Sequence, residues 1–519
     1  MYLTIMAVII MFIYIGRFLY QKTSSNSHSL PPGPTPLPFI GCIIQMLLNK
    51  PTFRWIHKLM DQFDTPILCI RLGPSTHVIS VSSPDIACEF LKKQDEIFIS
   101  RPDIMSAHLI ISNGYLTAIM SPNGEQWRKM KKVISREIVS SPIHKWLQPK
   151  RDEEADQLLK YIYNQTNKQE AIVGGALINV RAVSQQFFAN VTKNIVFGTS
   201  FFGQGMEDGG PGEEETEHVA ALFTMLKYVY AFCITDYFPL LRWKTDFDGH
   251  EKIIRAAIET VRKYQDPLVD ERIQMWKNCV RKEKFDMLDV LITLENTKLT
   301  SEEIKAQIVE LMVATIDNPS NAVEWTIGEM INEPMILKKA AEELDHVVGR
   351  QRLVEERDIP QLNYLKSCIK EAFRLHPFAP FLPPHVSTKN TIVAGYFIPK
   401  GSHVMLSRYG LGRNPKVWAD PLRFDPDRHL CGEGKQVVLS DDELRLISFS
   451  TGKRRCPGIR LGTTMTTMLL ARMVQGFVWE APGNERSIEL AENHNDLCMA
   501  KPLMAIAKPR LPRYMYPTD

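Results

Sequence analysis

The segment 449–458 constrains this chain more than any other, because it surrounds one cysteine with glycines and arginines. Gly452 and Gly458 allow the backbone to approach a large flat ligand without a side-chain clash. Backbone N–H groups in such a loop can stabilise negative charge on the sulfur of Cys456. Arg454 is suited to pair with a carboxylate of the ligand. These features indicate that Cys456 is the axial thiolate ligand of a haem iron, around which the chain must fold.

The same segment follows the pattern F-x-x-G-x-R-x-C-x-G, which begins at Phe449 and includes Cys456. It resembles the haem-binding signature of the cytochrome P450 monooxygenases. The resemblance implies a haem b cofactor whose iron is held by Cys456, and NADPH as the electron source through a reductase. A thiolate ligand favours cleavage of the O–O bond, which separates such enzymes from oxygen carriers with a histidine ligand.

A second set of residues resembles the family's E-x-x-R pair and its partner arginine. Glu371 and Arg374 are three positions apart, which places both side chains on one face of a helix that we expect to end at His376. Arg428 lies in a segment similar to the family pattern F-x-P-E-R-F, although here it ends in His429. The resemblance implies that Glu371, Arg374 and Arg428 form a buried structural charge network. The alternative is an ordinary surface ion pair, which would contribute little to stability.

Three more residues are similar to haem contacts of the family. Trp127 and Lys131 match a W-x-x-x-R segment in which the indole N–H and a cation one turn later hold a haem propionate. Lys131 replaces the usual arginine, so bidentate pairing is lost and a point charge remains. His385 stands where many relatives carry another propionate-binding arginine. The alternative for His385 is an ordinary loop histidine.

A long helix is predicted over residues 304–331. Thr300 and Glu303 have the spacing of a capping box, which marks the start of a helix. Pro319 lies inside the run and cannot donate to the carbonyl of Thr315, so it should kink the helix. The alternative is two shorter helices that meet at the proline.

The middle of this helix departs from the family pattern. Most relatives carry there a threonine that helps to deliver protons during oxygen activation, but this chain has Asn318. The segment 317–325 resembles one branch of plant cytochromes P450, the amino-acid N-monooxygenases that form aldoximes. Such substrates are zwitterions, so the pocket must satisfy both an amine and a carboxylate. We therefore expect Asp317, Asn318 and Asn321 to face the substrate or the oxygen, as the catalytic residues.

The resemblance runs from Pro31 to the C-terminus and implies a specific reaction. The enzyme would hydroxylate the amine of an L-amino acid twice, with O₂ and NADPH-derived electrons, and release the aldoxime. The branch favours phenylalanine or the branched-chain valine and isoleucine as the substrate. Two alternatives remain open: a carbon-hydroxylating cytochrome P450 acting on an apolar plant metabolite, and a reductase-independent haem-thiolate isomerase or dehydratase.

No linker divides most of the 519 residues. We expect residues 41–519 to form one large haem monooxygenase domain, mainly α with a minor β region (α+β). Strand patterns occur at residues 67–73, 77–83 and 391–398. The acidic, glycine-rich segment 205–217 is predicted to be a surface loop.

Residues 1–22 are predicted to be a transmembrane signal anchor. The first 16 residues are uncharged and strongly apolar, and Arg17 can reach the membrane surface. A cleaved signal peptide is the alternative, but a basic leading region and a small-residue cleavage pattern are absent. A polar and then proline-rich linker follows at residues 23–40. Positive charge after the anchor favours a catalytic domain in the cytosol, and the family resemblance implies the endoplasmic reticulum membrane.

Charge and cysteine content exclude some functions. The formal net charge of +3 gives no reason to expect a nucleic-acid partner. The nine cysteines are odd in number and scattered, so they form no disulfide framework and agree with a reducing compartment.

Overall fold

The structure is a computed structural model that describes residues 29–105, 108, 113–167, 175–229, 231–238, 246, 248–430, 432, 435–483 and 487–517. The predicted anchor at residues 1–22 and the first part of the linker, residues 23–28, lie outside this set. Within it, no helix has both the length and the apolar character needed to cross a membrane.

Helices dominate the described part of the chain, which confirms the predicted mainly α fold with a minor β region. The helices are α2 (Ile43–Leu48), α3 (Thr52–Gln62), α4 (Pro84–Cys88), α5 (Glu125–Val133), α6 (Ser141–Trp146), α7 (Gln148–Thr166), α8 (Val180–Phe197), α9 (Glu213–Val229), α10 (His250–Lys277), α11 (Met287–Ile292), α12 (Ser301–Asn332), α13 (Pro334–Val347), α14 (Asn363–Leu375), α15 (Arg408–Gly412) and α16 (Ile459–Gly476). The strands are β1 (Ile67–Leu72), β2 (Thr76–Val81), β3 (Ala176–Asn179), β4 (His385–Val386), β5 (Thr391–Val393), β6 (Tyr396–Ile398), β7 (His403–Leu406), β8 (Phe477–Glu480) and β9 (Met504–Pro509).

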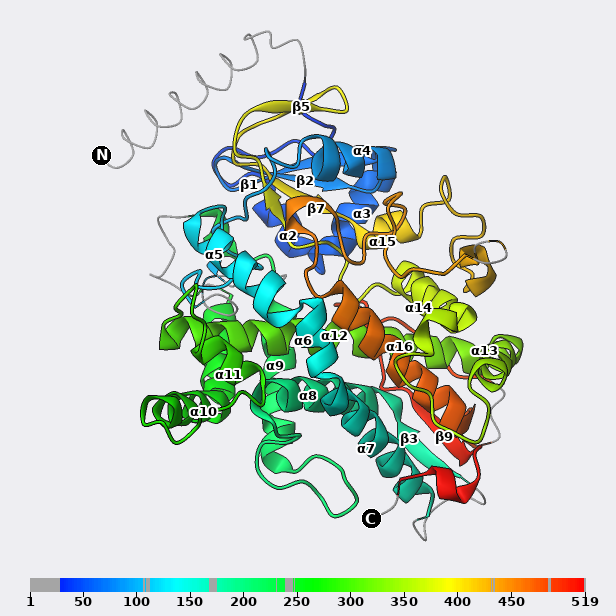
Figure 1. The fold of residues 1–519 in the computed structure, drawn as a ribbon. Coiled ribbons are helices and arrows are strands. Elements are labelled where there is room, and N and C mark those ends of the chain that lie inside the picture. Colours follow the sequence, from blue (N-terminus) through cyan, green and yellow to red (C-terminus); the bar gives the residue numbers. More distant parts are fainter. Residues whose placement is uncertain are drawn as a thin grey trace.

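The strands form small sheets at two ends of the molecule (Figure 1). One sheet has the order β1-β2-β7-β4, in which β2 and β7 are parallel and the other pairs antiparallel. The other has the order β3-β9-β8 and lies near the C-terminus. The strands predicted at 67–73 and 77–83 are β1 and β2, whereas the pattern at 391–398 is a hairpin of β5 and β6.

Helix α12 is the long helix predicted from the capping box. Thr300 Oγ1 accepts a hydrogen bond from the Glu303 N–H at 3.2 Å, and Glu303 Oε2 accepts one from the Thr300 N–H at 2.8 Å, which confirms the box. The helix continues through Pro319, so the alternative of two separate helices is wrong. Next to the proline, the Ser320 hydroxyl donates to the Ile316 carbonyl at 2.7 Å.

Helix α12 passes through the middle of the helical region (Figure 1), where α8, α14 and α16 pack against it. Its Trp325 is fully buried and stacks on His376, with ring centroids 3.8 Å apart. The prediction of a loop over residues 205–217 is wrong at its end, because α9 begins at Glu213. Three glutamates in the first turn of α9 favour a helix start there, since they face the positive end of the helix dipole.

Candidate active site

The cysteine loop is held in shape by its own backbone. A 3-10 turn, Gly452–Arg454, precedes Cys456, whose N–H donates to the Phe449 carbonyl at 3.0 Å. Gly452 has a φ of 72°, and a Cβ at that position would lie 2.6 Å from the Leu91 carbonyl oxygen. Both the left-handed backbone and the close contact require glycine. Cys456 is thereby placed just before α16, which packs on α12.

The Cys456 thiol is enclosed by protein and yet reachable. Burial raises its pKa, while a hydrogen bond from the Gly458 backbone and the charges of Arg408 and Arg455 lower it in part. The residue is nevertheless solvent-accessible. A ligand can therefore reach the sulfur. Gly458 lies next to the sulfur, since a Cβ there would be in ordinary contact with it at 3.9 Å.

Arg454 is a partly buried cation that has no anionic partner in the described part of the chain. Its guanidinium donates to the backbone carbonyls of Ile99 at 2.7 Å, Ala118 at 3.0 Å and Ser121 at 2.8 Å. It forms no ion pair with a carboxylate among the described residues, and it lies 4.2 Å above the Trp127 ring. Burial lowers the pKa of Arg454 to about 8. An anion bound at this position would remove that electrostatic penalty.

The structure places the three other predicted haem contacts as follows. Trp127, on α5, is buried, and its indole N–H has no hydrogen-bond acceptor in the described part of the chain. Lys131 lies 5.0 Å above the Trp127 ring and donates to the Lys453 carbonyl at 2.8 Å, which leaves ammonium hydrogens for another acceptor. His385, on β4, is buried, and its Nδ1 lies 2.7 Å from the Phe98 carbonyl oxygen.

The three residues of the predicted charge network meet at Glu371. Arg374 donates to both carboxylate oxygens, at 2.7 and 2.8 Å, and neither side chain of this pair is exposed. Arg428 donates to the same carboxylate at 3.0 Å. His429 adds a contact of 2.7 Å that sequence reasoning missed. Burial favours a higher pKa for Glu371, but the hydrogen bonds from Arg374 and His429 overcome it and hold the pKa at about 2.

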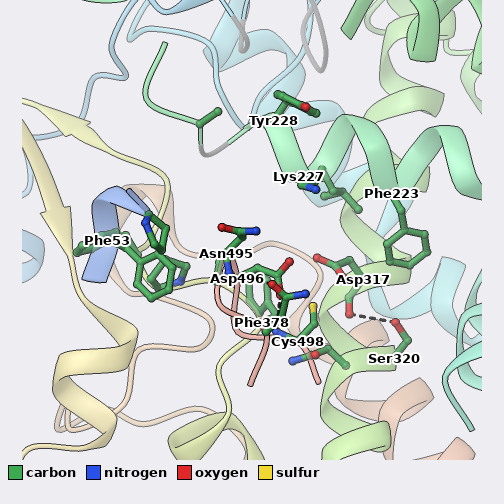
Figure 2. Close-up of a pocket in the computed structure, with 18 of the residues that line it drawn as sticks. Phe53, Phe223, Lys227, Tyr228, Asp317, Ser320, Phe378, Asn495, Asp496 and Cys498 are labelled. Carbon is green, nitrogen blue, oxygen red and sulfur yellow. Dashed lines mark hydrogen bonds between the residues drawn. The ribbon is translucent and has the colours of Figure 1, made fainter. Parts of the chain in front are cut away.

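A cavity of about 850 Å³ lies along α12 (Figure 2). Asp317, Ser320 and Asn321 of α12 line it, but Asn318 does not. The rest of the wall comes from segments distant in sequence, among them residues 50–53, α8, α9, the segment after α14 and the loop before β9. Figure 2 shows Asp317 and Asp496 pointing into this cavity from different segments. It is thus assembled from parts of the chain that are far apart in sequence.

Asp317 has an unusual electrostatic environment. Burial and, to a smaller extent, the charge of Asp496 raise its pKa to about 7, while Arg181 opposes the shift. Asp496 is fixed in place, because its Oδ1 accepts a hydrogen bond from the Cys498 N–H at 3.0 Å. Sequence reasoning missed Asp496, since nothing in the local sequence connects it with α12. An acid with a pKa near neutrality in a cavity is a candidate for proton transfer.

The cytochrome P450 family model matches residues 31–506, which is most of the chain. The chain belongs to the cytochrome P450 family. This cytochrome P450 is 53% identical over 503 residues to valine N-monooxygenase 1 of Manihot esculenta, a match that covers 96% of this chain and 91% of the relative. It is 51% identical over 499 residues to isoleucine N-monooxygenase 1 of Lotus japonicus, with 95% and 92% covered. It is 52% identical over 498 residues to a phenylalanine N-monooxygenase of Arabidopsis thaliana, with 94% and 93% covered.

These relatives confirm the resemblance to the amino-acid N-monooxygenase branch. Membership in the family implies a cysteine-ligated haem and electrons from a reductase. The residues of this cytochrome P450 fit that cofactor. Cys456 offers a reachable thiol. Within the described ranges, Arg454 has no anionic partner and the Trp127 N–H has no acceptor. Cys456 would hold the iron, and Arg454 and Trp127 would hold a propionate.

We expect Arg454→Ala to weaken haem retention by about 10- to 100-fold, as loss of a supporting partner does in other metal sites. The physical reason is that a propionate would lose its charged partner. The rate of haem transfer to an excess of apomyoglobin measures the effect. Arg513→Ala is the control, because Arg513 is an exposed arginine far from the cysteine loop in the sequence. Equal transfer rates for the two variants would remove Arg454 from the haem site.

Proposed function

We propose that this cytochrome P450 hydroxylates the amino group of an L-amino acid twice and releases the corresponding aldoxime. The bound haem b would supply the oxidising chemistry, with O₂ and with electrons from NADPH through a reductase. The observation that carries the proposal is the cavity along α12, in which acidic and basic side chains face a partly apolar space. A zwitterion with an apolar side chain requires such a mixture of groups.

The charged groups of the cavity suit the two ends of an amino acid. We assign the substrate ammonium to Asp317 and Asp496, which both point into the cavity (Figure 2). Lys227 of α9 lines the same cavity and forms no ion pair among the described residues, so we assign the substrate carboxylate to it. Phe223 and Phe378 supply apolar wall for the side chain.

Asp317 can also move a proton. An ammonium nitrogen has no lone pair, so it must lose a proton before it can be hydroxylated. The carboxylate of Asp317, with a pKa of about 7, is suited to accept that proton, because its affinity for a proton is balanced near physiological pH. Asp317 therefore acts in our proposal as the general base for the amine.

Asn318 and Asn321 complete the proposed catalytic set. In both residues the buried Oδ1 has no hydrogen-bond donor. The Nδ2 of Asn318 donates to the Ala314 carbonyl at 3.3 Å, and that of Asn321 to the His376 carbonyl at 3.4 Å. A buried amide oxygen without a donor carries a free-energy cost that a bound N–H or water would relieve. We propose that Asn321 accepts from the substrate amine, and that Asn318 holds a water for proton delivery where the family threonine is absent.

The Asp317 and Asp496 pair predicts a pH dependence for substrate binding. Amino-acid affinity should rise as the pH increases through about 7, because only the ionised Asp317 attracts the ammonium. Asp496→Asn removes a like charge, so the pKa of Asp317 falls and the rise occurs at lower pH. Above that range the variant should bind about 10-fold more weakly, since one charged hydrogen bond is lost. Titration of the haem spectrum with the amino acid across the neutral range measures both effects.

Glu480→Gln is the control for this prediction, because Glu480 is a half-exposed residue in a surface pair with Lys508. It should bind the amino acid with the wild-type pH profile. An Asp496→Asn variant with the same profile and affinity as the wild type would exclude Asp496 from the substrate site.

The experiment that tests the function uses the full-length enzyme with a reductase and NADPH. Each protein amino acid is supplied in turn, and any oxime is identified by mass spectrometry. We expect an aldoxime from phenylalanine, valine or isoleucine, because these are the amino acids for which the three relatives above are named. Oxime formation without NADPH would favour the isomerase or dehydratase class. Absence of any spectral response to free amino acids would favour a carbon-hydroxylating enzyme.

We further propose the cellular arrangement that the sequence indicates. Residues 1–22 would anchor the enzyme in the endoplasmic reticulum membrane, residues 23–40 would form the linker, and residues 41–519 would form the catalytic domain in the cytosol. The supporting observation is the uncharged apolar run at the start of the chain. This arrangement would place the catalytic domain on the side of the membrane where NADPH and a reductase supply electrons.

A further inference from the structure

A second cluster of potential ligands lies away from Cys456, between α9 and α10. Cys233 directly precedes a 3-10 turn, Ile234–Tyr237, and Asp248 and His250 stand at the start of α10. The Cys233 Sγ lies 3.2 Å from His250 Nδ1, and that nitrogen lies 3.4 Å from Asp248 Oδ2. All three ligand atoms are within 4.8 Å of one another. Gly249, with a φ of 71°, makes the turn between Asp248 and His250.

The geometry of the cluster differs from that of a hydrogen-bonded relay. In a relay, the sulfur and the carboxylate contact opposite nitrogens of the imidazole ring. Here both approach the same nitrogen, Nδ1 of His250. A single ring nitrogen offers either one hydrogen or one lone pair, so it cannot satisfy a thiol and a carboxylate together. Convergence of all three groups on one point is what ligation of a cation requires.

The carboxylate of Asp248 independently indicates that a ligand could bind at this cluster. Its side chain is only 8% exposed, and its buried Oδ1 has no hydrogen-bond partner among the residues that the structure describes. The other oxygen, Oδ2, is fixed by the Ile234 N–H at 3.0 Å. The His250 ring is fixed edge-on against Tyr228, with centroids 5.0 Å apart. Groups that orient the ligands in this way are typical of metal sites.

We propose that Cys233, Asp248 and His250 bind one zinc ion per chain. Sulfur and nitrogen ligands of one tetrahedral zinc lie about 3.6 Å apart, and nitrogen and oxygen ligands about 3.4 Å apart. The observed 3.2 and 3.4 Å need only a small adjustment to match. A thiolate, an imidazole and a carboxylate suit zinc better than calcium or magnesium, which prefer oxygen ligands alone. A water or the second oxygen of Asp248 would complete the coordination.

The surroundings favour a cation at this position. The negative charges of Asp236 and Asp246 act on Cys233 and raise its pKa, and the positive charge of Lys50 opposes them. His250 also lines the cavity along α12, so the zinc would lie in the wall of that cavity. The site shares no ligand with the haem or with the proposed substrate contacts. Its presence is therefore independent of the function proposed above.

The test uses the haem-loaded, full-length enzyme, in which Cys456 is occupied by the iron. The protein is treated with a chelator, incubated with zinc sulfate, desalted, and analysed for zinc and iron by atomic spectrometry. We expect one zinc per haem in the wild type and in Cys279→Ser, a control at an exposed cysteine. Cys233→Ser and Asp248→Asn should bind zinc at least about 10-fold more weakly. Retention of no zinc by the wild type, or equal zinc in wild type and Cys233→Ser, would overturn the proposal.

Cobalt substitution provides a second readout that depends on the ligands themselves. Cobalt bound to a thiolate gives a near-ultraviolet charge-transfer band. The band is measured as the difference between the spectra of the cobalt-treated and the cobalt-free enzyme. We expect it in the wild type and, at a higher cobalt concentration, in Asp248→Asn. It should be absent in Cys233→Ser. If Cys233→Ser fails to hold haem, the wild type and Asp248→Asn still test the proposal. A wild-type enzyme without the band has no cobalt–thiolate bond, and the proposal is then wrong.

Discussion

Replacement of Cys456 by serine should abolish oxime formation and remove the absorbance that is typical of a thiolate-ligated haem. Cys456 is the only cysteine of the F-x-x-G-x-R-x-C-x-G segment, and its sulfur is reachable while the surrounding loop is fixed by backbone contacts. A serine hydroxyl does not supply the electron density with which a thiolate favours O–O cleavage. The measurements are oxime yield and the spectrum of the reduced carbon-monoxide complex.

The control for this variant is Cys279→Ser, which changes an exposed thiol that lies outside the haem-binding segment. It should keep both the wild-type yield and the thiolate-type spectrum. If Cys456→Ser retained that spectrum, the iron ligand would have to be another residue, and the assignment of the whole loop would be wrong.

Arg374→Ala should destabilise the fold by about 3–5 kcal/mol, because it leaves the buried charge of Glu371 without its main partner. Both side chains are fully buried, and Arg374 also donates to the carbonyls of Gly412 and Pro421, each at 2.6 Å. The variant therefore loses an ion pair, the hydrogen bonds to these two carbonyls and a third, to the Arg423 carbonyl at 3.0 Å. Urea unfolding, followed by circular dichroism, measures the change in the free energy of unfolding. Haem content in purified protein should fall in parallel.

Lys338→Ala is the matched control for Arg374→Ala. Lys338 forms a helical pair with Glu342, but both side chains are 64% exposed, so the loss should be at most about 0.5 kcal/mol. Equal effects of the two variants would show that the Glu371 network contributes no more than a surface pair. The alternative interpretation of the E-x-x-R motif as a surface pair would then be correct.

Several parts of the fold could be predicted because their signals are local. The capping box at Thr300 and Glu303 marks the start of α12, and the spacing of Glu371 and Arg374 places both on one face of α14. Hydrogen bonds between residues three or four positions apart depend on the local sequence, so they can be read without the rest of the fold. The continuation of α12 through Pro319 follows from the same local pattern of apolar residues on both sides of it.

Other features needed the folded chain. The sequence shows that His429 replaces the last phenylalanine of the family pattern. It does not show the contact of His429 with Glu371, because the two residues are 58 positions apart. The start of α9 was missed because the glycine-rich residues before Glu213 hid the helix signal. Asn318 was expected in the pocket, whereas the cavity is lined by its neighbours Asp317 and Asn321. Which face of a long helix borders a cavity is decided by what packs against the other faces.

The sequence by itself was enough to predict the long helix and the family and to single out Cys456 as the candidate ligand, because each depends on a short run of residues with a fixed spacing. Only the tertiary structure decided which groups share the cavity along α12. Asp317, Asp496 and Lys227 come from three separate segments, and burial of the surrounding apolar surface brings them together. The pKa of Asp317 has the same origin, since it depends on desolvation and on the charge of Asp496 rather than on neighbouring residues in the chain.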